Sequence, residues 1–181
     1  LKVFLASRVF KRDLISAETM ANLCMDYYKG RRAADIVAQI PRFYDYWIEP
    51  LLSPAMLQRI ECHRSQGHIL IVLSASVDYI IEEVVSRLDL HHALCTRLEV
   101  DEAGLYTGRP IGPICLGKEK ERAARAFALQ HQVDLASSFA YSDHHSDIPL
   151  LSLVGHPVAV RPTSTLRTHA QTQGWTIIDE E

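Results

Sequence analysis

The sequence predicts an α/β protein in which an open, mostly parallel sheet carries helices on its faces and a helical region comes before it. Three observations support this fold class. Residues 1–52 show helical spacing of apolar side chains and no strand-like alternation. From residue 53 onward, short apolar runs alternate with helical segments. One of these runs, 69–73, is continuously apolar, which is typical of a parallel strand covered on both faces.

The first 52 residues predict two helical stretches. Ser16 can cap a helix that continues through Tyr27, and Gly30 is placed to end it. A second stretch follows, and Pro41 predicts a break or kink within it. Its apolar residues recur every three or four positions and should lie on one stripe of an amphipathic stretch: Ile36, Ile40, Phe43 and Trp47.

The remaining residues, 53–181, predict the α/β core. The first half should contain a helix at 54–66, a central strand at 69–73, a small-residue turn at 74–76, a helix at 77–88 and a hairpin at 97–109. The second half should contain helices at 118–132, 148–153 and 166–173, strands at 138–142, 158–160 and 176–178, and a polar loop at 143–147. We therefore expect a domain boundary between residues 52 and 53.

Composition excludes several classes of protein. Hydrophobic residues make up 48% and charged residues 23% of the chain, as in ordinary globular domains. The formal charge of −3 gives no basic field for nucleic acid, and no apolar run reaches the ~18 residues of a membrane helix. The four cysteines form no Cys-x-x-Cys pair, and no signal peptide is visible, so a reduced, cytoplasmic location is expected. Oligomeric state cannot be inferred from the sequence.

Four polar residues fall where predicted strands end or a helix begins: Ser74, Lys118, Asp143 and Asp147. In open α/β sheets, ligands bind outside the carboxyl ends of the strands. Carboxylates suit a hard cation such as Mg²⁺, whereas a hydroxyl and an ammonium group suit phosphoryl oxygens. Each residue also has a structural interpretation: Ser74 could cap the next helix, Lys118 could be a solvated member of a charge run, and the aspartates could form a turn and a helix cap.

The motifs that contain these residues resemble the haloacid dehalogenase superfamily, in the subfamily that includes phosphoserine phosphatase. The matching segments are 67–76, 107–118 and 141–151, and the tail from 157 to 175 is similar to bacterial members. The resemblance implies a Rossmann-like core with a helical cap at residues 1–52, and a Mg²⁺-dependent phosphatase acting on a small phosphorylated metabolite. It implies that Ser74, Ala75 and Lys118 bind phosphate, that Lys118 and Asp143 are catalytic, and that Asp143 and Asp147 serve the metal.

One departure from the family pattern is large. The family's nucleophile lies in an Asp-x-Asp-x-Thr loop after the first core strand, and this sequence contains no such loop. We therefore expect the first strand and the nucleophile to be missing and the chain as given to be inactive. Two hypotheses stay open: an N-terminally truncated enzyme that works through an aspartyl-phosphate, and a non-catalytic pseudo-phosphatase that binds phosphate ligands. His144 or His145 could also contact substrate.

Overall fold

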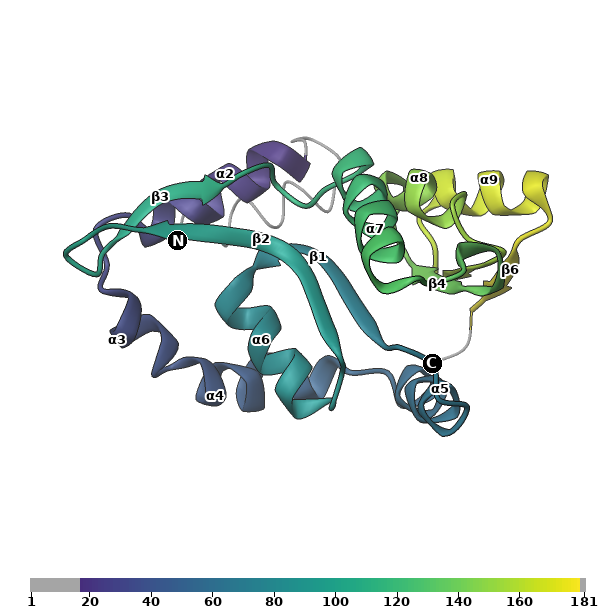
Figure 1. Ribbon diagram of the computed structural model, residues 1–181, viewed down its shortest axis with the longest axis horizontal. Helices are drawn as coiled ribbons and strands as arrows, with labels where there is room; N and C mark the ends of the chain where they lie inside the picture. Colours follow the sequence, from purple (N-terminus) through teal and green to yellow (C-terminus); the bar gives the residue numbers. More distant parts are fainter. Residues whose placement is uncertain (1–16, 180–181) are drawn as a thin grey trace. The chain divides into compact units, whose positions relative to one another are not determined.

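The computed structural model describes residues 17–179 (Figure 1). The chain forms two compact units, which are described separately below. The first unit contains the residues up to Leu52 together with Met56–Cys115. The second contains Ser53–Ala55 and the residues from Leu116 onward. This division differs from the predicted cap and core domains, 1–52 and 53–181, which stay a prediction.

The first unit begins with helices. They are α2 (Ala17–Tyr28), α3 (Ala33–Val37), α4 (Ile40–Phe43), a π-helical turn η1 (Tyr44–Ile48) and a 3-10 turn η2 (Glu49–Leu51). Gly30 has a φ of 76° and follows α2, as its position in the sequence predicts. The predicted cap residue Ser16 lies outside the described residues. The break in the second stretch falls at residues 38–39, because Pro41 sits in the first turn of α4, where its missing N–H costs nothing.

The predicted apolar stripe in this region is only partly buried. Ile40 is 7% exposed, as expected, but Phe43 is 41% and Trp47 is 67% exposed. The π-helical turn changes the angular spacing of side chains after Phe43. A stripe drawn with the α-helical period therefore does not extend unchanged beyond Phe43, and its last residues are exposed.

A three-stranded sheet follows. Helix α5 (Pro54–Ser65) leads to β1 (Ile71–Val77), α6 (Asp78–Arg87), β2 (His92–Val100) and β3 (Tyr106–Ile111). β2 pairs with β1 in parallel through its first half and with β3 as the predicted antiparallel hairpin through its second half. Helix α6 packs against β1 and β2, and α2 packs against β3.

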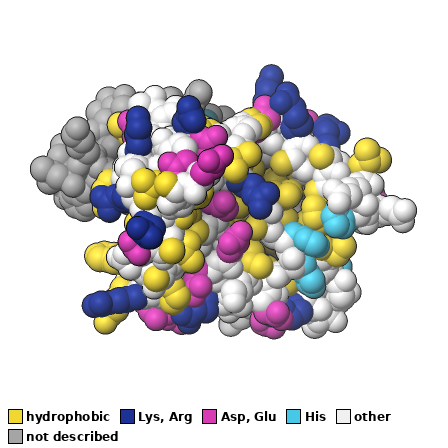
Figure 2. Space-filling model, turned by 60° about the vertical axis from the view of Figure 1, so that its left-hand side comes forward, with side chains coloured by type: hydrophobic (Ala, Val, Ile, Leu, Met, Phe, Trp, Pro, Cys, Tyr) yellow, Lys and Arg dark blue, Asp and Glu magenta, His cyan; other side chains and the backbone are white. Residues whose placement is uncertain are grey.

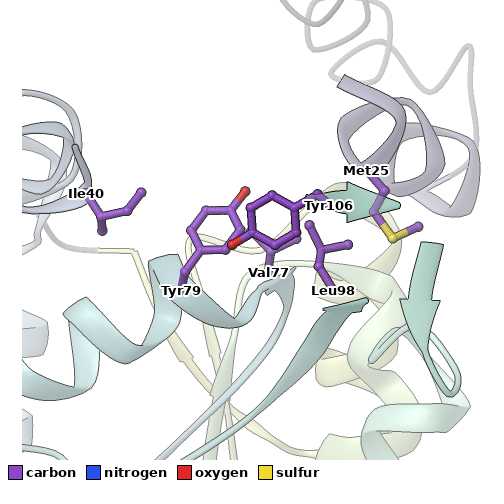
Figure 3. Close-up of a cluster of buried hydrophobic side chains, with 6 residues drawn as sticks. All are labelled: Met25, Ile40, Val77, Tyr79, Leu98 and Tyr106. Carbon is purple, nitrogen blue, oxygen red and sulfur yellow. The ribbon is translucent and has the colours of Figure 1, made fainter. Parts of the chain in front are cut away.

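The core of the first unit joins the helices to this sheet. Its buried side chains are Met25, Ile40, Val77, Tyr79, Leu98 and Tyr106 (Figure 3). Tyr28 packs edge-on against Tyr79 and Tyr106, with ring centroids 5.4 and 6.1 Å apart. The tyrosines thus bring together α2, α6 and β3, three elements that are distant in the sequence.

The second unit is a parallel sheet with helices. Its strands are β4 (Phe139–Ser142), β5 (His156–Val160) and β6 (Thr176–Ile178), in that order, and its helices are α7 (Lys118–His131), α8 (Ile148–Leu151) and α9 (Ser164–Gln173), with short turns η3 (Leu135–Ser137) and η4 (His145–Asp147). The core is fully buried and consists of Leu151, Ala159, Leu166 and Ala170. Ile177 and Trp175 pack against it.

The predicted α/β class with parallel strands is confirmed, but two details differ. The described strands form two three-stranded sheets instead of one. β1 extends to Val77, so the predicted turn at 74–76 belongs to the strand, with an irregular register after Ser74. The continuous apolar run is only partly shielded from water, because Ile69 is 47% exposed and residues 71–73 are half-buried, with α6 packed against β1. The absence of a first core strand stays a prediction.

Candidate active site

The loop after β4 holds the two predicted metal-ligating aspartates. Asp143 is the first residue after the strand, and its side chain is exposed, whereas Asp147 ends turn η4 and is 6% exposed. His144 caps this turn, because its Nδ1 accepts a hydrogen bond from the Ser146 amide at 3.2 Å. The Asp143 carbonyl oxygen accepts one from the Thr163 amide at 2.8 Å. The loop is therefore fixed on both sides of Asp143.

The buried carboxylate of Asp147 is the centre of a polar cluster. Its Oδ2 accepts hydrogen bonds from Lys120 Nζ and from Ser142 Oγ, each at 2.8 Å. The side chains of Lys120 and Asp147 are 11% and 9% exposed, so solvent screens the ion pair little. Buried charges are stable only when they are paired and hydrogen-bonded, and this arrangement satisfies that requirement at Oδ2.

The second carboxylate oxygen of Asp147, Oδ1, differs from Oδ2 in its hydrogen bonding. Oδ1 is buried and has no hydrogen-bond partner among the described residues. A buried acceptor without a donor is unusual, and a hard cation bound by oxygen would satisfy it. Asp143 and Asp147 fit such an ion as the one or two carboxylates that Mg²⁺ usually takes from a protein. Nowhere within residues 17–179 do three His, Cys, Asp or Glu side chains gather in a way that could hold a metal ion.

The two lysines at the start of α7 differ sharply in environment. Lys118, the predicted phosphate ligand, is exposed, and Lys120 is buried against Asp147. Lys120 belongs to the same charge run as Lys118 and was not selected from the sequence as a site residue. Helical periodicity would have found it, because positions seven and eight residues later are the buried Phe127 and Ala128. Position 125, seven residues after Lys118, is an exposed arginine.

Ser74 and Ala75 lie in the first unit, near the end of β1. Ser74 Oγ accepts a hydrogen bond from the Ser76 amide at 3.1 Å. The alternative that Ser74 caps α6 is wrong, because Val77 is the cap residue and no side chain bonds there. The Ala75 carbonyl accepts a hydrogen bond from the buried hydroxyl of Thr96 at 3.0 Å, which ties this end of β1 to β2.

The structure thus brings together Asp147 and two residues that were not predicted, Lys120 and Ser142, with Asp143 in the same loop. Ser74 and Ala75 belong to the other unit. Two cysteines are poor nucleophiles: burial raises the pKa of the Cys24 thiol, and burial followed by the charge of Asp78 raises that of Cys95 to about 11. The candidate functional groups of this site are therefore carboxylate and hydroxyl oxygens and a lysine ammonium group. No helix in the described part of the chain is long and apolar enough to cross a membrane.

Comparison with known proteins identifies the family. A family model of haloacid dehalogenase-like hydrolases matches residues 4–152. Phosphoserine phosphatase SerB1 of Mycobacterium tuberculosis is 33% identical over 153 residues, which cover 84% of this chain and 49% of that protein. The histidinol-phosphatase of Neisseria meningitidis serogroup C is 31% identical over 154 residues, 83% of this chain and 69% of that protein. A Bordetella pertussis protein of unknown function superposes with a TM-score of 0.85 at 25% identity, over 96% of this chain and 78% of that one.

A carboxylate loop follows the parallel strand β4, and the buried Lys120 pairs with Asp147 of that loop. In open α/β sheets, ligands bind outside the carboxyl ends of the strands. The chain belongs to the haloacid dehalogenase-like hydrolases. It spans about half the length of several curated relatives that it matches. The predicted resemblance is confirmed.

Proposed function

We propose that this chain carries most of a Mg²⁺-dependent phosphomonoester hydrolase that acts on a small phosphorylated metabolite. The observation that carries the proposal is the buried ion pair between Lys120 and Asp147. Asp147 lies in the loop that follows β4, and its second carboxylate oxygen has no hydrogen-bond partner among the described residues. Family membership and relatives named for phosphoserine and histidinol phosphate support the substrate class. Phosphoserine and histidinol phosphate are therefore the first substrates to test.

The described residues would serve three tasks. Asp143 and the free oxygen of Asp147 would hold Mg²⁺, which when bound offsets the charge of the phosphoryl oxygens. The hydroxyl of Ser74 and the backbone at Ala75 would receive the phosphoryl group. A lysine would stabilise the negative charge that develops during transfer, and a group that is already fixed and shielded from water does so most strongly.

Lys118 and Lys120 are alternative candidates for that lysine. Lys118 is the residue that the motif resemblance selects. Burial and a fixed partner favour Lys120, because its ammonium group is already held beside a proposed metal ligand. In that position Lys120 would also orient the carboxylate of Asp147 toward the ion.

The covalent step requires an aspartate that this sequence does not supply in the family's Asp-x-Asp-x-Thr context. In that step an aspartate oxygen bonds to phosphorus, the alcohol leaves, and water then cleaves the aspartyl-phosphate. We therefore propose that the 181-residue chain does not turn over phosphomonoesters. A pseudo-phosphatase that only binds phosphate ligands is the second candidate, favoured by the same missing motif.

The gene sequence and one assay separate these candidates. The DNA upstream of the Leu1 codon is read in frame, and the protein that it encodes is assayed with p-nitrophenyl phosphate, phosphoserine and histidinol phosphate, with and without Mg²⁺. An upstream Asp-x-Asp-x-Thr and Mg²⁺-dependent hydrolysis support the enzyme. A start codon at Leu1 supports the pseudo-phosphatase. Hydrolysis by the unextended chain would place the nucleophile among residues that we assign to other roles.

The same assay distinguishes the two lysines in an active, extended protein. Lys118→Met and Lys120→Met are identical changes on one helix, one at an exposed and one at a buried position. Loss of kcat by 100-fold or more in Lys120→Met, with a change below threefold in Lys118→Met, is expected if Lys120 is the functional lysine. The reverse order would restore Lys118. Circular dichroism at the assay temperature checks that each variant is folded.

A further inference from the structure

A cleft of about 710 Å³ lies in the first unit, and none of the proposed phosphate or metal residues is among those that line it. It is bounded by α2, the short helices α3 and α4, the π-helical turn η1 and α6. The lining residues that matter below are Tyr27, Arg31, Arg42, Phe43, Tyr46 and Trp47. The volume falls within the range of roughly 300–1,000 Å³ typical of small-molecule sites.

The walls of this cleft are unusually exposed aromatic rings. Tyr27 is 50%, Tyr46 is 66% and Trp47 is 67% exposed. Two of these rings come from the π-helical turn Tyr44–Ile48, a rare local structure that is frequent at functional sites. In the space-filling view, hydrophobic side chains reach the surface among lysine and arginine side chains (Figure 2). A flat, apolar ligand would cover rings that the unit leaves in water.

Two arginines give the cleft its charge. The Arg31 guanidinium carbon lies 4.0 Å from the centroid of Tyr27, and its Nε donates to the Tyr27 carbonyl at 3.0 Å. The Arg42 guanidinium carbon lies 5.5 Å from the centroid of Tyr46. Within residues 17–179 neither arginine forms an ion pair, whereas Arg87 nearby pairs with acidic side chains. The cleft thus combines stacking surfaces with positive charge that no carboxylate of the described chain neutralises.

We propose that this cleft binds a planar aromatic molecule that carries an anionic substituent. The ring stacks on the tyrosine and tryptophan side chains, and the anion is held by the guanidinium groups of Arg31 and Arg42. The proposal requires no metal ion and no phosphoryl transfer. It therefore stands or falls independently of the proposed hydrolysis.

The test uses the full 181-residue chain with 1-naphthoate as the probe and 1-naphthamide as its neutral isostere. Naphthoate contains no phosphoryl group, and the titration is done in EDTA, so that the proposed phosphate site is not involved. Calorimetry should show saturable binding of one naphthoate, at least tenfold tighter than naphthamide. In a Trp175→Phe background, the fluorescence of Trp47 should change with the same dissociation constant.

Variants connect the binding to the cleft. Arg31→Gln and Arg42→Gln should each weaken naphthoate binding at least fivefold and leave naphthamide unchanged. Arg122→Gln, at an exposed position on α7, removes the same charge elsewhere and should have no effect. Absence of saturable binding, equal affinity for naphthoate and naphthamide, or an equal loss in Arg122→Gln would each overturn the proposal. Trp47→Ala changes a largely exposed side chain, so that it should abolish the binding without unfolding the chain.

Discussion

Replacing Lys120 by methionine should destabilise the second unit strongly. Methionine has a similar length and replaces the apolar stem of lysine, but it lacks the ammonium group that lies 2.8 Å from Asp147 Oδ2. The Asp147 side chain, which is 9% exposed, would keep Ser142 as its donor at that oxygen. Breaking a buried ion pair from one side costs about 3–5 kcal/mol, because the remaining charge is left without compensation. We expect a loss within this range.

Two further variants make the result specific. Lys118→Met removes a charge from the same helix at an exposed position and should change the free energy of unfolding by less than about 0.5 kcal/mol. The double variant Lys120→Met/Asp147→Leu replaces both charges by apolar groups and should recover most of the loss. The wild type, Lys120→Met, Asp147→Leu and the double variant together form a double-mutant cycle.

The free energies are measured by urea unfolding at pH 7. A Trp47→Phe background leaves Trp175 as the fluorescent reporter, and this residue packs against the core of the second unit. A Lys120→Met variant as stable as Lys118→Met, or a cycle without coupling, would refute the reasoning that the pair is buried, charged and mutually dependent.

Two other predictions concern the fold. Gly155→Ala should lower the free energy of unfolding by more than about 3 kcal/mol or prevent folding, because its Cβ would lie 1.7 Å from a backbone carbonyl oxygen. Gly174→Ala has open space around it and a φ of 67°, so that it should lower the free energy of unfolding by only about 1 kcal/mol in the same urea assay. Hydrogen bonds from Thr107 and then Arg109 lower the pKa of Glu99, so its contribution to stability is present above the ordinary glutamate pKa and is lost as pH falls through the lowered value. The difference in melting temperature between wild type and Glu99→Gln should therefore be present at pH 7 and vanish toward pH 3; a difference independent of pH would contradict this.

Local signals in the sequence located most helices and strands of this protein, although not all of their bounds. Gly30, Gly67 and Gly174 all adopt positive φ just after a helix ends, a conformation that glycine reaches without steric cost. The loop from Asp143 to Asp147 could be predicted because its polar residues directly follow an apolar strand. Where a strand ends depends on residues that are adjacent in the sequence. Motif spacing then indicated the family, which comparison confirmed.

The sequence by itself determined the class of fold, the order of helices and strands, and the carboxylate loop, because each depends on residues a few positions apart. Only the tertiary structure decided which lysine lies on Asp147, since Lys118 and Lys120 differ in the neighbours that α7 presents to them and not in type. It also decided that Trp47 faces solvent, because burial depends on which surface another segment covers. Local pattern specifies what an element is, and the packing of distant segments specifies what each side chain touches.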